Sequence, residues 1–272
     1  MRHKLLNLCL SISCLLALLS NASGAACSPQ LRFVADEFGR YFFLNTNKQP
    51  AGIDYDILTE ISRRMHCQMS LEVESNVRLL RRIEAGTADV AAHKIRTPER
   101  EKIAWMVPYL QQRNFAIVRK HATTGGKVAF LANKQLNVAV GRSFSHGPGY
   151  DNIISQLRDQ GRVIEVADIN SLYNMLIIRR VQAIFSPPAV YRAMLSKHQI
   201  ENEFIPEDWV PDDPITILNL MLSKTRFSTE QVHQIEELIK AMQHDGTLQK
   251  ILKKHLGATD AAKMLIVSPK SK

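Results

Sequence analysis

The chain has few cysteines and none of the patterns that mark a serine hydrolase or a metal enzyme. Two of its four cysteines, Cys9 and Cys14, lie in an apolar run near the N-terminus. No Gly-x-Ser-x-Gly elbow is present, and the histidines are scattered without an i, i+4 pair or a Cys/His framework. We therefore expect no nucleophilic serine, no metal site and no cofactor.

The chain also lacks a long basic block. Lys and Arg outnumber Asp and Glu by 35 to 26, which gives a formal net charge of +9, but the cations occur singly or in pairs such as Arg63-Arg64. Removal of Arg2 and Lys4 with a leader would leave +7 (9 minus 2). A dispersed charge without interleaved aromatics does not indicate a nucleic-acid partner.

The N-terminus has the pattern of a secretory signal peptide over residues 1–26. A basic start precedes an apolar run at 5–19 and small residues at 21–26, and the run is short for a membrane span. This predicts a periplasmic protein. Cys27 allows a lipid anchor as an alternative, although Gly24 stands where a lipoprotein signal usually has a large aliphatic residue. An even pair in an oxidising compartment, Cys27 and Cys67, predicts a disulfide.

Apolar runs alternate with helical periodicity through the rest of the chain, which predicts an α/β fold. The expected strands are residues 31–35, 69–73, 88–92, 115–118, 136–140, 163–166, 183–185 and 215–222. The expected helices are residues 53–66, 77–85, 151–160, 172–178, 228–245 and 248–256, with a further helix that starts at Pro98, carries Trp105 and is stopped by Pro108. Residues 258–272 are expected to form a loose basic tail.

The strand at 88–92 leads into Thr97-Pro98-Glu99-Arg100, the most informative motif of the chain. Thr97 is a favoured N-cap and Pro98 suits the first helical position, so a helix should begin here. Free backbone amides and the Arg100 fork would together suit a carboxylate at the carboxyl end of a strand. The alternative is an ordinary capped surface helix.

Two other segments have two interpretations each. The loop at residues 36–50 is rich in aromatics, Phe42 among them, and these form either part of the core or a wall of a ligand site. The turn at 143–147, Ser-Phe-Ser-His-Gly, offers hydroxyls and amides at the end of a strand. It is either a second lip of the ligand site or a plain connection.

Four short motifs in a fixed order resemble the family 3 extracellular solute-binding proteins, the polar amino-acid receptors of bacterial ABC importers. They are Gly-Ile-Asp-Tyr-Asp at 52–56, Gly-Thr-Ala-Asp at 86–89, Thr-Pro-Glu-Arg at 97–100 with Pro-Tyr at 108–109, and Asp-Gly-Thr at 245–247. The resemblance covers about residues 31–255.

The resemblance implies the two-lobed type II periplasmic binding protein fold. Lobe one would comprise residues 27–111 and 218–257, lobe two residues 119–210, and the hinges residues 112–118 and 211–217. It also implies a monomer that delivers a small carboxylate ligand to an inner-membrane ABC permease.

The same resemblance suggests roles for individual residues. Arg100 matches the arginine that clamps the ligand carboxylate, Thr97 its partner at the helix start, Asp36 the acidic residue after the first strand, and Ser145 a hydroxyl of the second lobe. Phe42 is expected to contact the ligand from the aromatic loop.

The chain departs from the family pattern at positions that matter for amino-acid binding. His93 and Ile95 stand where small hydroxyl residues or glycine are usual, and Pro187 stands where an aspartate holds the ligand ammonium. These changes, with Arg142 and His146 in the second-lobe turn, favour either a carboxylate ligand without a free α-amino group or an altered amino-acid pocket.

Two other functions remain open at this stage. Some relatives of this family are periplasmic dehydratases that act on cyclic carboxylates, and His93, His146 or Asp36 would be the acid–base candidates. The third hypothesis is a sensory or accessory module that docks on another envelope protein.

Overall fold

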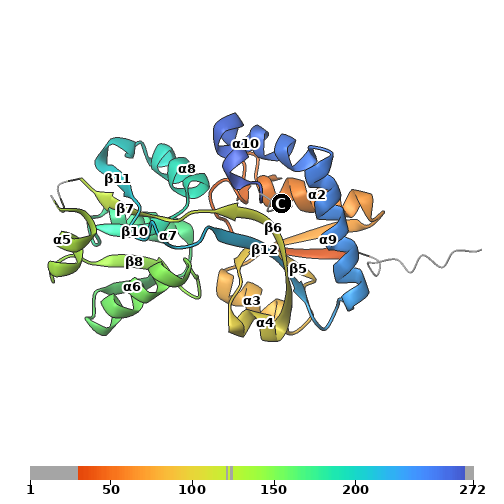
Figure 1. Cartoon of the computed structure of the whole chain (residues 1–272), viewed down its shortest axis with the longest axis horizontal. Helices are drawn as coiled ribbons and strands as arrows, with labels where there is room; N and C mark the ends of the chain where they lie inside the picture. The colour runs from red at the N-terminus through yellow and green to blue at the C-terminus, as the bar shows by residue number, and fades with distance from the viewer. Residues whose placement is uncertain (1–29, 121, 123–124, 267–272) are drawn as a thin grey trace, which may run out of the picture.

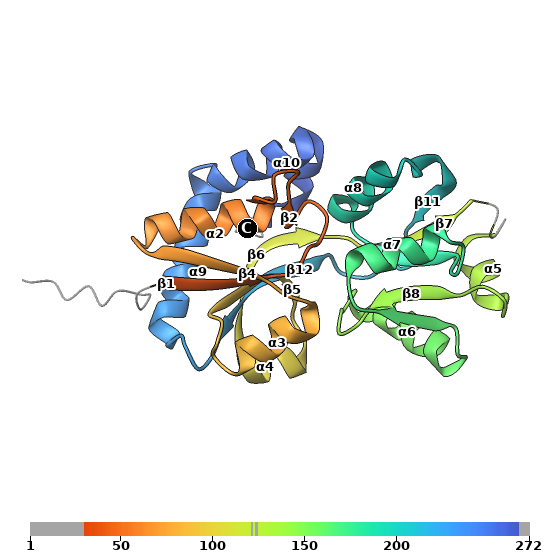
Figure 2. The ribbon, with the colours of Figure 1, turned by 180° about the vertical axis from the view of Figure 1, so that it is seen from behind.

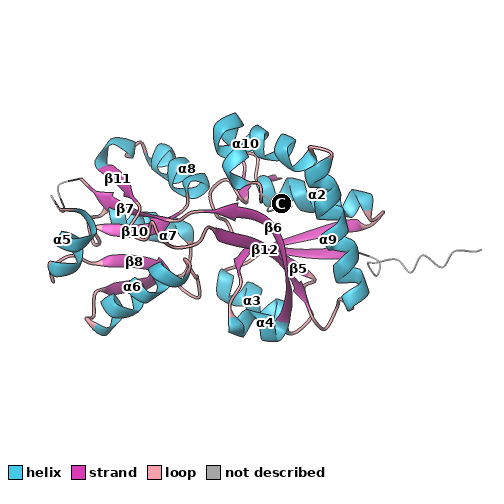
Figure 3. Ribbon diagram, viewed as in Figure 1, coloured by secondary structure: helices cyan, strands magenta, loops and turns pink. Residues whose placement is uncertain are grey.

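The computed structural model describes residues 30–120, 122 and 125–266. In this part of the chain two five-stranded sheets lie side by side, and each is covered by helices (Figures 1 and 2). Figure 3 shows the same arrangement by secondary structure, with strands inside and helices outside. The two-lobed α/β fold predicted from the sequence is therefore confirmed. The predicted signal peptide, Cys27 and the last six residues lie outside the described residues.

The first lobe is built on the sheet β4-β1-β5-β12-β6. Its strands are β1 (Gln30–Ala35), β4 (Gln68–Val73), β5 (Val90–Ile95), β6 (Ala104–Gln112) and β12 (Thr216–Ser223), beside a hairpin of β2 (Phe43–Leu44) and β3 (Pro50–Ala51). Its helices are α2 (Ile53–Arg64), α3 (Asn76–Glu84), α4 (Pro98–Ile103), α9 (Thr229–His244) and α10 (Thr247–Met264).

The side-chain alternation of β1 explains why helices cover both faces of this sheet. Phe33 belongs to the core beneath α2, α9 and α10, whereas Val34 packs with Leu79 and Ile83 of α3 on the other face. Successive strand residues point to opposite faces, so an apolar run such as this needs cover on both sides. β1 pairs in parallel with β4 and β5, and their carboxyl ends face the second lobe.

The second lobe is built on the sheet β11-β7-β10-β8-β9. Its strands are β7 (Phe115–Arg119), β8 (Val138–Gly141), β9 (Val163–Val166), β10 (Ala183–Ser186) and β11 (Phe204–Glu207). Its helices are α5 (Gly126–Ala132), α6 (Pro148–Asp159), α7 (Ile169–Ile177), α8 (Pro188–His198) and the 3₁₀ turn η1 (Glu201–Glu203). Ile184 packs on the α7 and α8 side, and Phe185 on the α5 and α6 side.

The chain crosses between the lobes twice, from β6 to β7 and from β11 to β12 (Figure 1). Only Arg113 and Asn114 lie between β6 and β7, so most of the segment predicted as the first hinge is strand. Residues 208–215 form the second crossing. The lobe boundaries follow the sheets, and which residues bend as hinges stays a prediction.

The structure corrects the prediction for the segment after Arg100. Helix α4 ends at Ile103, and Trp105 and Pro108 lie in β6, not in or after a helix. β6 is an edge strand, where proline is tolerated because its missing N–H would face no neighbouring strand. Pro108 sits at a register shift opposite Asn219 of β12.

The C-terminal segment is also more ordered than the sequence suggests. Gly257 adopts a left-handed φ of 77° and kinks α10, but the helix continues to Met264. Ala261 and Met264 are buried, and Asp260 pairs with Arg192 of the other lobe. The part of the predicted loose tail that the structure describes is therefore mostly helix. No helix among the described residues is both long and apolar enough to span a bilayer.

Candidate functional site

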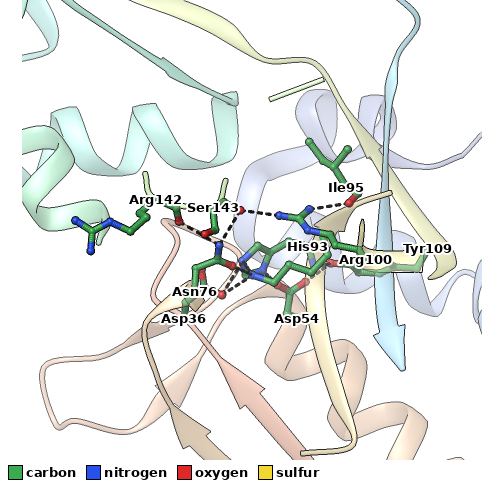
Figure 4. Close-up of polar contacts among 10 residues, drawn as sticks. Asp36, Asp54, Asn76, His93, Ile95, Arg100, Tyr109, Arg142 and Ser143 are labelled. Atoms are coloured by element: carbon green, nitrogen blue, oxygen red, sulfur yellow. Dashed lines mark hydrogen bonds and ion pairs between the residues drawn. The ribbon is translucent and has the colours of Figure 1, made fainter. Parts of the chain in front are cut away.

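Arg100 lies at the junction of the two lobes, with its side chain buried. Thr97 caps α4, and its hydroxyl accepts a hydrogen bond from the Arg100 backbone N–H at 3.3 Å, as the motif predicts. The guanidinium donates from Nη1 to the Ile95 carbonyl at 2.7 Å and from Nη2 to the Ser143 carbonyl at 2.9 Å (Figure 4). Ile95 belongs to the first lobe and Ser143 to the second. Arg100 therefore joins the lobes through carbonyl groups.

A bulge in β5 decides which side chains enter this junction. Two β5 residues, Ala92 and His93, stand against one residue of β12 between the pairs Met221–Ala91 and Asn219–Lys94. His93 has a positive φ of 46°, a strained conformation for a non-glycine residue. A bulge of this kind re-aims the side chains around it. His93 and Lys94 consequently both contact Asp36, which follows β1.

The Lys94 ammonium lies inside the junction and has four neighbours, one of which is the His93 ring nitrogen Nε2 at 3.4 Å. Nζ donates to Asp36 Oδ1 at 2.8 Å and to Asn76 Oδ1 at 3.0 Å, and it lies 5.8 Å from the ring centroid of Phe144. Lys94 is only 2 % exposed and Asp36 only 5 %. An unpaired buried charge costs roughly several kcal/mol, so each of these two charges stabilises the other in its buried position.

His93 is held between two carboxylates. Its Nδ1 lies 2.6 Å from Asp54 Oδ2 and its Nε2 lies 3.2 Å from Asp36 Oδ1, and the ring stacks on Phe38 at 5.1 Å. Tyr109 completes the group because its hydroxyl donates to Asp54 Oδ1 at 2.6 Å and accepts the His93 backbone N–H. Acceptors at both ring nitrogens favour the imidazolium form.

Burial and charge oppose each other in this network. Burial lowers the pKa of Lys94 and that of Arg100. Burial would raise the pKa of Asp36, but the nearby charges of Lys94 and His93 bring it well below its ordinary value. For His93, burial and the Lys94 ammonium act downward, Asp36 and Asp54 act upward, and the pKa is raised overall. The ionised forms of Asp36 and His93 therefore support each other.

The second-lobe turn closes the junction from the other side. Ser143 has a φ of 63°, and its carbonyl accepts hydrogen bonds from Arg100 and from Asn76 Nδ2, the latter at 3.1 Å. Asp151 holds the turn by accepting the Ser145 hydroxyl at 2.6 Å and the His146 backbone N–H at 2.8 Å. Both of these donors are thereby committed within the second lobe.

The remaining space in the junction is small. A cavity of about 20 Å³ is left between the lobes. Its lining comprises Phe38, Asn76, His93, Lys94, Ile95, Arg100, Gln112, Asn114, Phe144, Ser145 and His146. Ligand sites usually measure about 300–1,000 Å³, whereas one water needs roughly 10–15 Å³ of such space. In this closed conformation the protein's own side chains and the Ser143 carbonyl fill the junction.

The structure brings some of the predicted site residues together and separates others. Arg100, Thr97, Asp36, His93 and Ile95 meet at the carboxyl ends of β1 and β5, although Ile95 contributes only its carbonyl to Arg100.

Three further predicted residues do not present free groups to the junction. Phe42 lies in the core with no exposed surface and packs edge-on against Phe33. Ser145 borders the cavity, but its hydroxyl is bonded to Asp151. Arg142 is exposed, and its side chain extends away from the other labelled residues (Figure 4).

Sequence reasoning about the site did not single out Lys94, Asp54, Asn76, Tyr109 or Phe144. Lys94 lies three residues before Thr97, and a lysine beside His93 in a mostly apolar strand is the available signal. Asp54 lies in the first turn of α2, where an acidic residue is common because it complements the helix dipole, and Asn76 and Phe144 carry no signal of their own. Pro187 borders a different hollow of about 450 Å³, on the side of Tyr191 and Met264.

The structure describes one cysteine of the predicted disulfide, Cys67. Gln30 of β1 pairs in parallel with Gln68 of β4, directly after Cys67. Cys27 lies outside the described residues, and its bond to Cys67 stays a prediction. The described residues contain no group of three or more His, Cys, Asp and Glu side chains that could hold a metal ion.

The sequence of the chain matches one known protein family. Residues 33–258 match the bacterial extracellular solute-binding proteins, family 3. No curated protein sequence matches the chain significantly.

Solved structures share the fold at low sequence identity. An ancestral arginine-binding protein bound to arginine superposes with a TM-score of 0.73 at 19% identity, over 85% of this chain and 99% of that one. The solute receptor for L-cysteine of Neisseria gonorrhoeae gives 0.73 at 14%, over 88% and 96%. A putative L-cystine ABC transporter from Listeria monocytogenes gives 0.69 at 21%, over 85% and 97%. These neighbours are binding proteins of two-lobed form, and the family match spans most of the chain. This protein therefore belongs to the bacterial extracellular solute-binding proteins, family 3.

Proposed function

We propose that this protein is a receptor for a small organic acid, which binds between the lobes with its carboxylate on Arg100. One observation carries the proposal. The buried Arg100 guanidinium donates to two backbone carbonyls, and among the described residues it forms no ion pair with a carboxylate. A buried cation whose hydrogen-bond partners are neutral is a favourable place for an anion.

The Ser143 carbonyl marks the place that the ligand would take. Hydrogen bonds between an arginine and a carboxylate are about twice as strong as those between neutral groups, and the planar fork binds both oxygens. Opening of the lobes would remove the Ser143 carbonyl from Nη2, while Ile95 stays on Nη1 because it belongs to the same lobe as Arg100. A carboxylate that enters the open cleft would then replace a neutral acceptor with a charged one.

Binding on this scheme is a shift between two populations. The closed form without ligand is held by contacts of the protein with itself, and the ligand must favour its own closed complex over that form. Only molecules with open lobes can take up the ligand, so the apparent affinity is the intrinsic affinity multiplied by the open fraction. We therefore expect modest affinity unless the ligand contacts both lobes.

The groups near Arg100 favour an acid without an α-amino group. Asp36, which could hold a ligand ammonium, is paired with Lys94 and His93. Pro187 stands where the family resemblance expects an aspartate, and a proline has no group to hold an ammonium. Keto acids, hydroxy acids and dicarboxylates are the classes we would test first.

Delivery to a membrane permease is part of the same proposal. The family is named for extracellular solute-binding proteins, and one neighbour of the same fold is a putative L-cystine ABC transporter. Together with the secretory pattern at the N-terminus, this supports a periplasmic receptor that presents its ligand to an ABC importer.

Binding assays with Arg100 variants test the proposal. A thermal-shift screen of amino acids, keto acids and dicarboxylates identifies a ligand, and calorimetry then compares wild type with Arg100→Ala, Arg100→Lys and the control Arg158→Ala. Arg158 pairs with Glu165 on the surface of the second lobe. We expect at least about a tenfold loss for both Arg100 variants, because a lysine cannot replace the fork, and no change for the control. Unchanged affinity in Arg100→Ala would overturn the proposal.

The filled junction also favours a second candidate function. With only about 20 Å³ between the lobes, the closed protein would act as a non-transport module that docks on another envelope protein. A screen in which no metabolite raises the melting temperature, combined with a partner that co-purifies at a fixed ratio, would select this function. A metabolite that binds in an Arg100-dependent manner would exclude it.

A further inference from the structure

Asp36, Asn76 and Phe144 surround the Lys94 ammonium in the way that a binding site surrounds an ammonium ligand. One carboxylate oxygen and one amide oxygen lie at 2.8 and 3.0 Å from Nζ, and an aromatic ring lies at 5.8 Å. The adjacent His93 Nε2 also lies 3.4 Å from Nζ, but the imidazolium form of that ring offers no acceptor. A carboxylate, an amide carbonyl and a π-face are the three acceptors that proteins use for such cations. They come from three different parts of the chain, so the arrangement is a pocket and not a local ion pair.

Lys94 enters this pocket because of the β5 bulge. Its backbone lies in the middle of the first-lobe sheet, and its side chain is almost fully buried. A lysine at such a place is costly unless every donor finds an acceptor. The pocket supplies those acceptors, as it would for a small molecule.

We propose that Asp36, Asn76 and Phe144 form an ammonium subsite and that the protein's own Lys94 is its permanent occupant. The consequence, which rests on the proposed function, is that Lys94 determines specificity: it excludes acids that carry an ammonium group beside the carboxylate.

A free amino acid competes poorly with this occupant for two reasons. Lys94 is tethered to the pocket, and groups on short tethers have effective concentrations on the order of millimolar. A displaced Lys94 would also remain close to the incoming ammonium, and like charges in a buried place repel strongly. An acid without an ammonium meets neither obstacle.

Rescue of Lys94→Ala by an amine tests the occupancy without any carboxylate ligand. Alanine keeps the β-carbon, so the deleted atoms correspond to n-propylammonium. We expect the variant to melt below wild type and n-propylammonium chloride to raise its melting temperature by at least about 3 °C over sodium chloride at equal ionic strength. The neutral n-propanol should have no such effect.

Two matched proteins control for nonspecific effects of the amine. Wild type, with Lys94 in place, should show no response. The double variant Asp36→Asn/Lys94→Ala lacks the carboxylate that recognises the amine and should also show none. Equal responses in all three proteins, or no response in Lys94→Ala, would overturn the proposal. If the single variant does not fold alone, refolding with n-propylammonium but not with sodium chloride supports the proposal, and failure in both overturns it.

A second arm tests the consequence for specificity. Calorimetry compares wild type and Lys94→Ala with an amino acid and with the keto acid of the same side chain. The variant should gain at least about tenfold in affinity for the amino acid relative to the keto acid, because Asp36 is free to bind the ammonium. Amine rescue without this gain would support Lys94 as the occupant of the subsite but overturn its role in specificity. Keto-acid binding by Arg100→Ala tests the proposed function separately.

Discussion

Replacement of Lys94 by methionine should destabilise the protein strongly while it leaves the packing nearly intact. Methionine has a similar length and no charge, so the variant removes the ammonium without leaving a large cavity. Asp36 would then keep only His93, at 3.2 Å, because its Oδ2 has no hydrogen-bond partner in the described structure.

The magnitude follows from the cost of an unpaired buried charge. Removal of one partner of a buried ion pair costs about 3–5 kcal/mol. Because His93 still faces Asp36, we expect the low end, about 3 kcal/mol at neutral pH. The double variant Asp36→Asn/Lys94→Met contains no such charge and should lie within about 1 kcal/mol of wild type, since neutral replacement of a buried pair is often tolerated.

Urea unfolding followed by tryptophan fluorescence measures these changes. Trp105 lies in β6 of the first lobe and Trp209 follows β11 in the second, so both lobes are reported. The surface substitution Lys240→Met is the matched control and should change stability by less than about 0.5 kcal/mol.

The pH dependence sharpens the test. In wild type the pKa of Asp36 is lowered, so its ionised form stabilises the fold above the ordinary value of 3.8 and this contribution is lost as the pH falls. In Lys94→Met the lowering is largely removed, so the difference from wild type should shrink as the pH falls below 3.8. A loss below about 1 kcal/mol at neutral pH, or a loss independent of pH, would refute the reasoning.

Two further predictions concern the closure of the lobes and the second-lobe turn. Asn76→Ala removes the hydrogen bonds from Asn76 to the carbonyls of Ser143 and Arg142, so the lobes of the unliganded protein should open. The radius of gyration measured by small-angle X-ray scattering should then increase. An unchanged value would show that other contacts hold the lobes together. Burial lowers the pKa of His146 from 6.5 to about 4; the Arg100 charge also acts downward and the Asp151 charge opposes the shift. Because the unfolded chain takes up this proton at a higher pH than the folded protein does, the free energy of unfolding should fall by about 3 kcal/mol between pH 6.5 and pH 4. Urea unfolding of His146→Gln should show a correspondingly smaller loss over that range, and equal pH profiles would contradict the assignment.

Local patterns were sufficient for the elements that depend on local chemistry. Thr97 caps α4 as its side chain and the following proline indicate. The apolar runs at β1, β4 and β12 form strands, and Ser228 forms a capping box with Gln231, a pattern that is visible in the sequence. Propensity, caps and periodicity act within a few residues of sequence, so they can be read without the fold.

Other features required the position of a segment in the fold. Pro108 stops helices in general, yet it lies in a strand here because β6 is at the edge of its sheet. Gly257 interrupts α10 with a kink, yet the chain turns helical again because Ala261 and Met264 find a buried surface, which involves residues far away in sequence. Tertiary packing outweighs local preference at both places.

The sequence by itself determined the two-lobed α/β fold, the family and the presence of an arginine at a helix start near the carboxyl end of a strand. Only the tertiary structure decided what surrounds that arginine. A bulge in β5 turns Lys94 toward Asp36, 58 residues away, and His93 toward Asp54, 39 residues away. Contacts between distant residues depend on register and on the approach of the lobes, and neither is written in the pattern of any single segment.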